Sequence, residues 1–313
     1  MDASVIIPAR DAAATLPATL AALAAQRTAA SFEVVVVDDG SRDATAAIAR
    51  AAGAPVRVVA GAGEGPAAAR NRGAAVAAGA ALAFTDADCA PEPGWLGALL
   101  AALEAADLVQ GRVLPAPGAA RGPFDRTISV TAEHGLYETA NLGIRRDWFE
   151  RLGGFESILR PRGGKELGED VWLGWRARRA GARTAFCAEA VVHHAVFPRG
   201  PAGYVGERAR LRFFGPLVRQ VPELREAFLY RRVFLSRRSA EFDLALTAVA
   251  AAALTRRPWL LAGALPYART LRAEARHWPE HGPLRVGAVQ LAADAVGAGA
   301  LAAGSLRAAA PVL

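Results

Sequence analysis

Residues 33–41 read Glu-Val-Val-Val-Val-Asp-Asp-Gly-Ser, a β-branched run followed by acidic residues and a glycine. This run predicts a buried strand from Glu33 to Val37, and the Asp-Asp-Gly that follows is typical of the turn that ends a strand. A shorter run of the same kind, Val5 to Ile7, ends at Pro8. Between the two runs, three leucines recur at helical spacing. The order strand, helix, strand predicts that the two strands pair in parallel.

The same alternation continues towards residue 85. In order, we expect a helix over residues 45–52, a strand over 56–60, a helix over 66–78 and a strand over 81–85. Strands that alternate with helices indicate an α/β fold with a mostly parallel sheet covered by helices on both faces. Ligands of such sheets bind beyond the carboxyl ends of the strands, which here carry residues 8–11, Asp38-Asp39 and Asp86-Ala87-Asp88.

The composition narrows the class of protein. With 313 residues, 53% of them hydrophobic, the chain is long enough for one large α/β domain plus a smaller appendage, and wholesale disorder is excluded. Its two cysteines, Cys89 and Cys187, give neither a disulfide framework nor the spacing of a metal site. The N-terminus has no basic n-region or cleavage site, so we expect no signal peptide and a reduced cytosolic setting.

From about Val205 the strand pattern gives way to alanine- and leucine-rich helices, so we divide the chain into residues 1–204 and 205–313. Residues 244–255 and 258–268 carry no charge, but each is shorter than the ~20 apolar residues of a membrane-spanning helix. Residues 286–306 are long enough, but Gln290 and Asp294 interrupt them.

Arginines interleaved with aromatic residues between Arg208 and Arg238 suit an anionic membrane surface. We therefore expect the C-terminal region to lie on, or dip shallowly into, the cytoplasmic face of the cell membrane. True membrane spans, and a soluble helical subdomain of a cytoplasmic protein, are the alternatives.

Two pairs of acidic residues stand at predicted strand ends. Asp86 and Asp88 repel each other unless a cation lies between them, and hard oxygen ligands suit Mg²⁺ or Mn²⁺. Asp39, in the other pair, can accept from a nucleobase N–H or a ribose hydroxyl, or it can form an ordinary Asx turn.

Three further groups lie between residues 141 and 194. Glu169-Asp170 stands at a helix start, where acids either complement the helix dipole or act as a general base. Asn141 and Arg145 can hold hydroxyl or phosphate groups. His193 and His194 close a strand-like segment, and adjacent residues of a strand point to opposite faces, so one of them can face the site.

Taken in order, these motifs resemble the family 2 glycosyltransferases, which have the GT-A fold. The resemblance covers residues 3 to 200, and the order and spacing of the motifs carry it. The motifs are Val5-Ile6-Ile7-Pro8, Val37-Asp38-Asp39-Gly40-Ser41, Ala69-Arg70-Asn71-Arg72-Gly73, Asp86-Ala87-Asp88, residues 141–155, and Gly168-Glu169-Asp170 through Arg176 and Gly181.

On the donor side, the resemblance implies a nucleotide-sugar pocket. Asp39 would contact the nucleobase, Pro8, Arg10 and Arg70 would line the same pocket, and Asp86 would face the ribose or the sugar. In this chain Arg10-Asp11 stands where the family often has an aromatic residue and Asn.

The resemblance also implies a metal and a base. Asp88, completed by His194 or His193, would bind Mn²⁺ or Mg²⁺ on the diphosphate. Asp170 would be the catalytic base, with Glu169 beside it. Two departures concern these motifs: Cys89 stands where another acid is common, and Trp172 follows the base by two residues. We expect Trp172, Asn141 and Arg145 to contact the acceptor.

The expected activity is that of an inverting, metal-dependent glycosyltransferase of the hexosyltransferase type. It would transfer a sugar from a nucleoside-diphosphate sugar to a hydroxyl of a lipid-linked or cell-surface glycan. The alternative is a catalytically silent nucleotide-sugar-binding membrane module, which would not need both acidic motifs. A nucleotidyltransferase would carry a glycine- and lysine-rich loop, which residues 8–15 lack. The net charge of +7 comes with no recognisable nucleic-acid-binding module, so nucleic acid is not an expected partner.

Overall fold

The computed structural model describes residues 1–119, 121–159 and 167–313, which form two compact units. The first unit contains residues 1–119 and the described part of 127–196, and the second contains residues 121–126 and 197–313. The boundary between the two units therefore falls after Val196, whereas the sequence predicted a boundary after residue 204. A short segment from the first half of the chain also joins the second unit.

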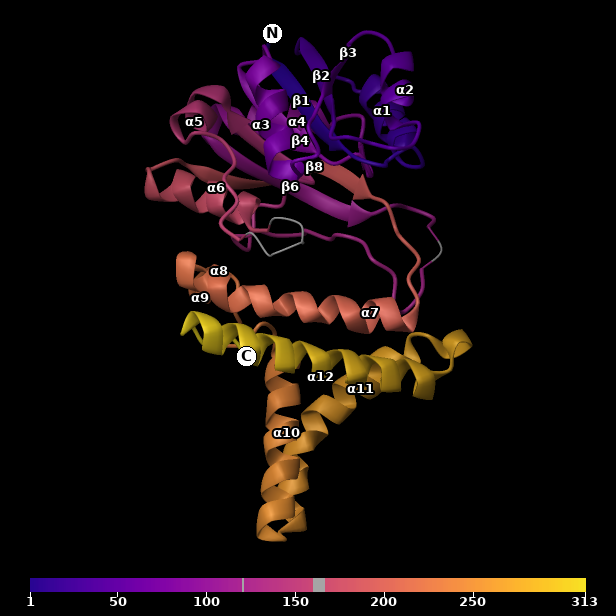
Figure 1. The fold of residues 1–313 in the computed structure, drawn as a ribbon, viewed down its shortest axis with the longest axis vertical. Coiled ribbons are helices and arrows are strands. Elements are labelled where there is room, and N and C mark those ends of the chain that lie inside the picture. Colours follow the sequence, from indigo (N-terminus) through magenta and orange to yellow (C-terminus); the bar gives the residue numbers. More distant parts are fainter. Residues whose placement is uncertain (120, 160–166) are drawn as a thin grey trace. The chain divides into compact units, whose positions relative to one another are not determined.

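The first unit alternates strands with helices in the predicted order (Figure 1). Up to residue 85, each observed boundary lies within two residues of its expected position. The strands are β1 Ala3–Ala9, β2 Phe32–Asp38, β3 Val56–Ala60, β4 Ala81–Thr85, β5 Cys89–Pro91, β6 Leu108–Pro115, β7 Asn141–Arg145 and β8 Thr184–His194. The helices are α1 Leu16–Ala24, α2 Thr45–Ala51, α3 Pro66–Val76, α4 Trp95–Ala105, α5 Arg146–Arg151 and α6 Glu169–Arg179.

These strands form one mixed sheet in the order β3-β2-β1-β4-β7-β6-β8-β5. Strands β3, β2, β1 and β4 are parallel, and so are β6 and β8, whereas β7 and β5 run antiparallel to their neighbours. The register pairs Ala9 with Asp38, so the carboxyl ends of β1 and β2 meet at one edge. Antiparallel β7 starts at that edge, where Asn141 pairs with Thr85, and ends at the other edge.

Helices cover both faces of this sheet (Figure 1). On one face, alternate side chains of β1 such as Val5 and Ile7 join a single buried cluster with leucines of α1 and α4. On the other face Ile6 meets α3, where a Cβ on Gly73 would lie only 2.6 Å from Ile6 Cγ2. This glycine sets how closely α3 packs on the sheet, and α3 carries Arg70.

The named elements in the described part of the second unit are all helices. Its α-helices are α7 Pro201–Glu207, α8 Phe214–Gln220, α9 Leu224–Ala227, α10 Arg237–Thr255, α11 Leu265–Arg276 and α12 Pro283–Ala308. Its 3₁₀ helices are η1 Arg208–Phe213, η2 Pro258–Ala264 and η3 Pro279–His281.

Helix α12 is the central packing helix of the second unit. Among the described helices it is the one long and apolar enough to cross a bilayer. A Cβ on its Gly304 would lie 2.1 Å from the Arg212 carbonyl oxygen, so the helix packs directly on the backbone of η1. Asp294 of α12 also pairs with Arg238 of α10 at 2.7 Å and accepts from Tyr267 of α11 at 2.8 Å. These contacts fix one side of α12 to the rest of the unit, while other side chains such as Leu284 and Leu306 are exposed.

Candidate active site

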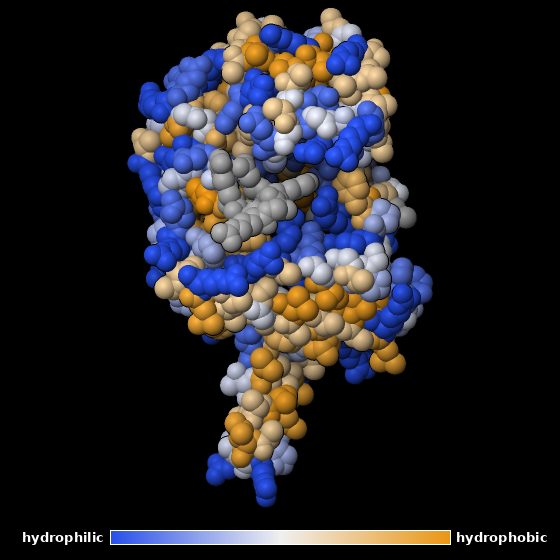
Figure 2. All heavy atoms as spheres, in the orientation of Figure 1, coloured by the Kyte–Doolittle hydropathy of each residue, from blue (hydrophilic) through white to orange (hydrophobic). Residues whose placement is uncertain are grey.

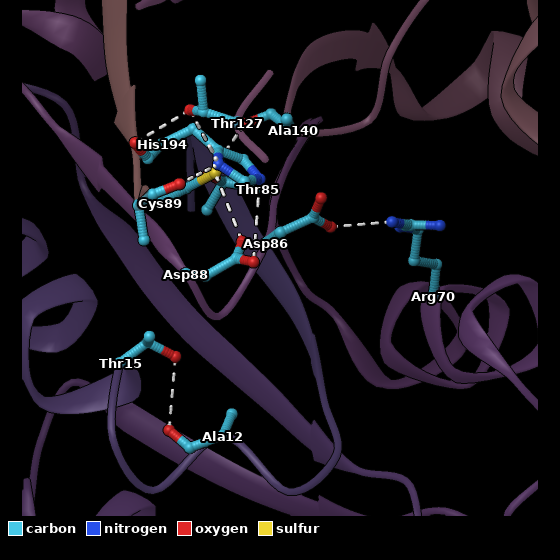
Figure 3. A network of polar contacts seen from close by, with 11 residues as sticks. Ala12, Thr15, Arg70, Thr85, Asp86, Asp88, Cys89, Thr127, Ala140 and His194 are labelled. Atoms are coloured by element: carbon cyan, nitrogen blue, oxygen red, sulfur yellow. Dashed lines mark hydrogen bonds and ion pairs between the residues drawn. The ribbon is translucent and has the colours of Figure 1, made fainter. Parts of the chain in front are cut away.

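Three side chains that can ligate a metal meet where β5 pairs with β8 (Figure 3). The ligand atoms of Asp88, Cys89 and His194 all lie within 4.8 Å of one another. His194 is 3% exposed, and its Nε2 lies 3.6 Å from Asp88 Oδ2. Pairing of Cys89 with His194 across the two strands fixes this arrangement.

The hydrogen bond of His194 orients its ring for a cation. Nδ1 lies 2.6 Å from the Ala195 carbonyl oxygen, which can only accept, so Nδ1 donates there and the Nε2 side of the ring faces Asp88. Burial, and then the charges of Asp86 and Asp88, raise the pKa of the Cys89 thiol well above its usual range. Asp88 and His194 offer a carboxylate oxygen and an imidazole nitrogen, which are ligands that Mn²⁺ takes, and diphosphate oxygens could complete the coordination.

His193 points away from this group. Its Nε2 lies 2.9 Å from Glu92 Oε1, as expected when successive side chains of β8 alternate between faces. Of the two histidines that the sequence left open, His194 is the one beside Asp88.

Arg70 joins two acidic groups that are far apart in the sequence. Its side chain is 5% exposed, with one guanidinium nitrogen 2.7 Å from Asp86 Oδ1 and another 3.3 Å from Glu169 Oε1. Burial alone would lower the pKa of Arg70, but the two carboxylates outweigh it and raise that pKa, so the guanidinium stays charged. Arg70 therefore links α3, the end of β4 and the start of α6 by a buried ion network.

Asp170 is the second residue of α6 and is half-buried. Burial raises the pKa of its carboxyl well above the usual range, and the neighbouring charges of Glu169 and Glu138 raise it further, while Arg70 opposes the shift. Glu169 itself is tied to Arg70. A carboxyl whose pKa is moved towards neutrality is the form that general bases take in enzymes.

Glu138 is a site residue that the sequence did not single out. Burial raises the pKa of its carboxyl, although His134 lies 3.4 Å away and opposes the shift. The preceding residue, Tyr137, has a φ of 55° and packs so closely on α6 that a Cβ on Gly174 would lie 2.1 Å from its ring. This close packing brings the segment that carries Glu138 to the helix that carries Asp170. No local sequence pattern reports it.

Three of the residues expected to bind the nucleotide sugar lie at or just after the carboxyl ends of β1 and β2. Pro8 pairs with Val37 near the end of β1, and Arg10 follows β1 with an exposed side chain. Asp39 is 4% exposed, and its carboxylate accepts three backbone N–H groups of the loop before α3, those of Gly63, Glu64 and Gly65 at 2.8–3.2 Å. Asp39 thus shapes this loop, and its contact with a nucleobase stays a prediction.

The three expected acceptor contacts are in different environments. Asn141 is fully buried: its amide accepts from Trp95 Nε1 at 2.8 Å and donates to two backbone carbonyls. Arg145 ends β7 at the opposite edge of the sheet, near Asp107 and Asp147. Neither side chain is placed to meet an acceptor at the strand ends, because one is enclosed and the other lies across the sheet. Trp172 remains, half-buried on α6 with its Nε1 3.2 Å from Glu156.

Known proteins match this chain in both sequence and fold. A family model described as Glycosyl transferase family 2 matches residues 4–157. Glycosyltransferase AglE of Haloferax volcanii is 32% identical over 212 residues, which make up 63% of this chain and 68% of AglE. The chain belongs to glycosyltransferase family 2. It is therefore an enzyme that transfers a sugar, and the alternative of a silent binding module is set aside.

Solved structures show the fold of this family 2 enzyme. S. aureus TarS 1-349 in complex with UDP-GlcNAc has a TM-score of 0.54 at 18% identity, covering 99% of this chain and 93% of TarS 1-349. Mannosyltransferase PcManGT from Pyrobaculum calidifontis, in complex with GDP-Man and Mn²⁺, has a TM-score of 0.58 at 18% identity, covering 98% of this chain and 86% of PcManGT. The predicted α/β fold of GT-A type, followed by a helical region, is confirmed.

Proposed function

We propose that this family 2 enzyme transfers a sugar from a nucleoside-diphosphate sugar to a hydroxyl group, with inversion at the anomeric carbon and with a divalent cation. The acceptor would be a lipid-linked or cell-surface glycan at the cytoplasmic face of a membrane. The observation that carries the proposal is the Arg70 network, which ties Asp86 on the donor side to Glu169-Asp170 on the base side.

On the donor side, Asp88 and His194 are the residues that would hold Mn²⁺ or Mg²⁺. When bound, such a cation offsets the charge that develops on the departing diphosphate. Asp86, whose Oδ1 pairs with Arg70, would accept a hydrogen bond from a ribose or sugar hydroxyl. The nucleotide-sugar complexes of TarS and PcManGT, the latter with Mn²⁺, support this class of donor.

Asp170 would act as the general base. As the acceptor oxygen bonds to the anomeric carbon, Asp170 takes the hydroxyl proton, and the bond from that carbon to the diphosphate oxygen breaks. Attack from the side opposite the leaving group inverts the configuration. Glu169 is the weaker candidate because its carboxylate is ion-paired with Arg70, whereas the pKa of Asp170 is raised.

Membrane attachment is supported by the second unit. Among the described residues, the large hydrophobic side chains that are exposed all lie between Leu244 and Leu313, apart from Met1. A soluble cytoplasmic enzyme is the alternative.

The test is a nucleotide-release assay across a panel of nucleotide sugars, with Mn²⁺ or Mg²⁺ and with EDTA, in the presence and absence of lipid-linked acceptors. The proposal expects release that needs both the cation and an acceptor. Equal turnover in EDTA would contradict the role given to Asp88 and His194.

A further inference from the structure

The second unit carries a hairpin with an unusual surface. We define the apolar hairpin as residues 244–268, which comprise the end of α10, the turn at Arg256-Arg257, η2 and the first residues of α11. Arg256 has a φ of 56°, and this left-handed residue ends α10. The returning segment packs closely, since a Cβ on Gly263 would lie 2.9 Å from Ala248 Cβ. Figure 1 shows the two arms running together.

Seven large hydrophobic side chains of the apolar hairpin are exposed, and Figure 2 shows mostly hydrophobic colours over this part of the chain. They are Leu244, Leu246, Val249, Leu254, Trp259, Leu261 and Leu265, with exposed fractions between 46% and 85%. At 100° per residue, the four on α10 point in directions all around the helix. A helix in water keeps a polar face towards the solvent, and one that is apolar all round is normally surrounded by apolar material.

The hydroxyl groups of the apolar hairpin donate hydrogen bonds within the chain. Between Asp243 and Arg256, and again between Arg257 and Arg269, there is no charged residue. The hydroxyls of Thr247 and Thr255 donate to the carbonyl oxygens four residues back, at 2.8 and 2.7 Å. Such bonds let threonine lie in an apolar medium without water. The Tyr267 hydroxyl donates to Asp294 within the unit.

Arginines follow the returning arm of the apolar hairpin along α11. Arg269, Arg272 and Arg276 are exposed and, at spacings of three and four residues, share one face of α11. Arg272 and Arg276 also line a groove between α11 and α12 whose other lining residues are apolar, among them Leu271 and Leu291. A row of guanidinium groups beside apolar surface complements lipid phosphates lying above acyl chains.

We propose that the apolar hairpin inserts into the acyl-chain region of a bilayer containing anionic lipids, with the arginine face of α11 at the phosphates. Residues 244–255 extend about 18 Å as a helix, against about 30 Å for the hydrocarbon core, so the hairpin enters the bilayer without crossing it. The charges of Arg256 and Arg257 oppose deep insertion of the tip, so we expect the arms to lie at a shallow angle, with these two side chains extended to the phosphates of the leaflet that the hairpin enters. Helix α12 stays in the folded unit, held by Asp294 and η1.

Two leucines offer a matched pair for the test. Leu254 in the apolar hairpin is 85% exposed, and Leu306 near the end of α12 is 84% exposed. In flotation of the full chain with vesicles of equal parts phosphatidylcholine and phosphatidylglycerol, Leu254→Glu should lower the bound fraction about tenfold or more, because it places a carboxylate among acyl chains. Leu306→Glu should leave binding unchanged. Equal effects of both variants, or a wild-type chain that does not float, would overturn the proposal.

Trp259 gives a second test, which uses the chain without the Leu254→Glu or Leu306→Glu substitution. It is 66% exposed and lies two residues from the tip. Lipids brominated on their acyl chains should quench part of the tryptophan emission, and Trp259→Phe should abolish that quenched part. Emission unaffected by these lipids would contradict insertion. Nucleotide release with a soluble acceptor should stay normal in Leu254→Glu, so insertion and the proposed reaction fail or succeed separately.

Discussion

The Arg70 network and the apolar hairpin are opposite exceptions to the usual distribution of side chains in a folded protein. In the network, Arg70 and Glu169 are charged and their side chains are no more than 10% exposed. In the hairpin, Leu254 and Trp259 are apolar and at least 66% exposed. Burying a charge costs several kcal/mol that pairing must offset, and leaving a large apolar side chain in water forgoes about 1.5–3 kcal/mol.

Each exception points to something outside the chain. The buried charges are arranged at the strand ends where sheets of this kind bind ligands, so they fit a reaction between polar substrates. The exposed apolar side chains cover a hairpin without internal partners for them, so they fit a lipid bilayer. Function in this enzyme is therefore expected at the two places where the ordinary rules of burial are broken.

The largest expected effect comes from the base in the first region. Asp170→Asn keeps the size of the side chain and removes its basicity, so transfer should fall by at least about 10²-fold while donor affinity holds. Steady-state transfer rates and calorimetry of donor binding measure the two quantities. The matched control is Glu169→Gln, which should lose less. Should the glutamine variant lose more than the asparagine variant, the base would be Glu169.

Removing the Arg70 guanidinium should lower the free energy of unfolding and shift the pH dependence of kcat. Arg70→Met leaves the buried Glu169 and the half-buried Asp86 without their partner, which should cost about 3–5 kcal/mol in the free energy of unfolding. Arg70 also lowers the pKa of Asp170, so its loss raises that pKa. Because the base works unprotonated, the acidic limb of kcat against pH should move to higher pH.

Urea unfolding and a pH–rate profile test this variant. Arg70 was expected from the family resemblance to line the nucleotide pocket, and that role would instead raise KM for the donor. An unchanged pH profile together with a raised KM would therefore mean that Arg70 acts on donor binding and not on the pKa of Asp170.

The metal side should respond through donor binding. Asp88→Ala removes the carboxylate oxygen from the donor set and should abolish the Mn²⁺-dependent part of nucleoside-diphosphate affinity, seen by calorimetry. His193→Ala is the matched control, because His193 pairs with Glu92 and not with the Asp88 group. A loss of metal dependence in the His193 variant equal to that in Asp88→Ala would contradict the assignment.

The smallest expected effect is on the folding of the hairpin itself. Leu99→Ala, at a fully buried position of α4, should cost about 2–5 kcal/mol in the free energy of unfolding. Leu254→Ala should change that free energy by less than about 0.5 kcal/mol in lipid-free buffer, because Leu254 is already in water. Thermal or denaturant unfolding compares the two. A cost at Leu254 close to that at Leu99 would mean that the hairpin packs against protein.

Much of the fold was predictable because local sequence patterns determine where its strands and helices form. The β-branched runs, turn residues and leucine spacing predicted the early elements and their carboxyl ends. The direction of β7 was not predictable, because a short apolar strand reads alike in parallel and antiparallel pairing. That direction sends Arg145 to the far edge while Asn141 is enclosed.

The site was predictable as a set of acids but not as a network. Sequence order cannot report that Arg70 reaches Asp86 and Glu169 together, since those contacts span 16 and 99 residues. Alternation along a strand showed that His193 and His194 point to opposite faces, but only the pairing of β5 with β8 placed His194 beside Asp88. Glu138 reaches the site through the packing of Tyr137 on Gly174, which no sequence pattern records.

The proposed reaction is a single displacement at the anomeric carbon, with Asp170 as the only base. Proton NMR of the first product formed from a nucleotide sugar of known anomeric configuration tests this mechanism. We expect the new glycosidic bond to have the opposite configuration to the donor from the earliest time point. A product that retains the donor configuration would require two displacements or a front-side attack, and it would contradict the role given to Asp170.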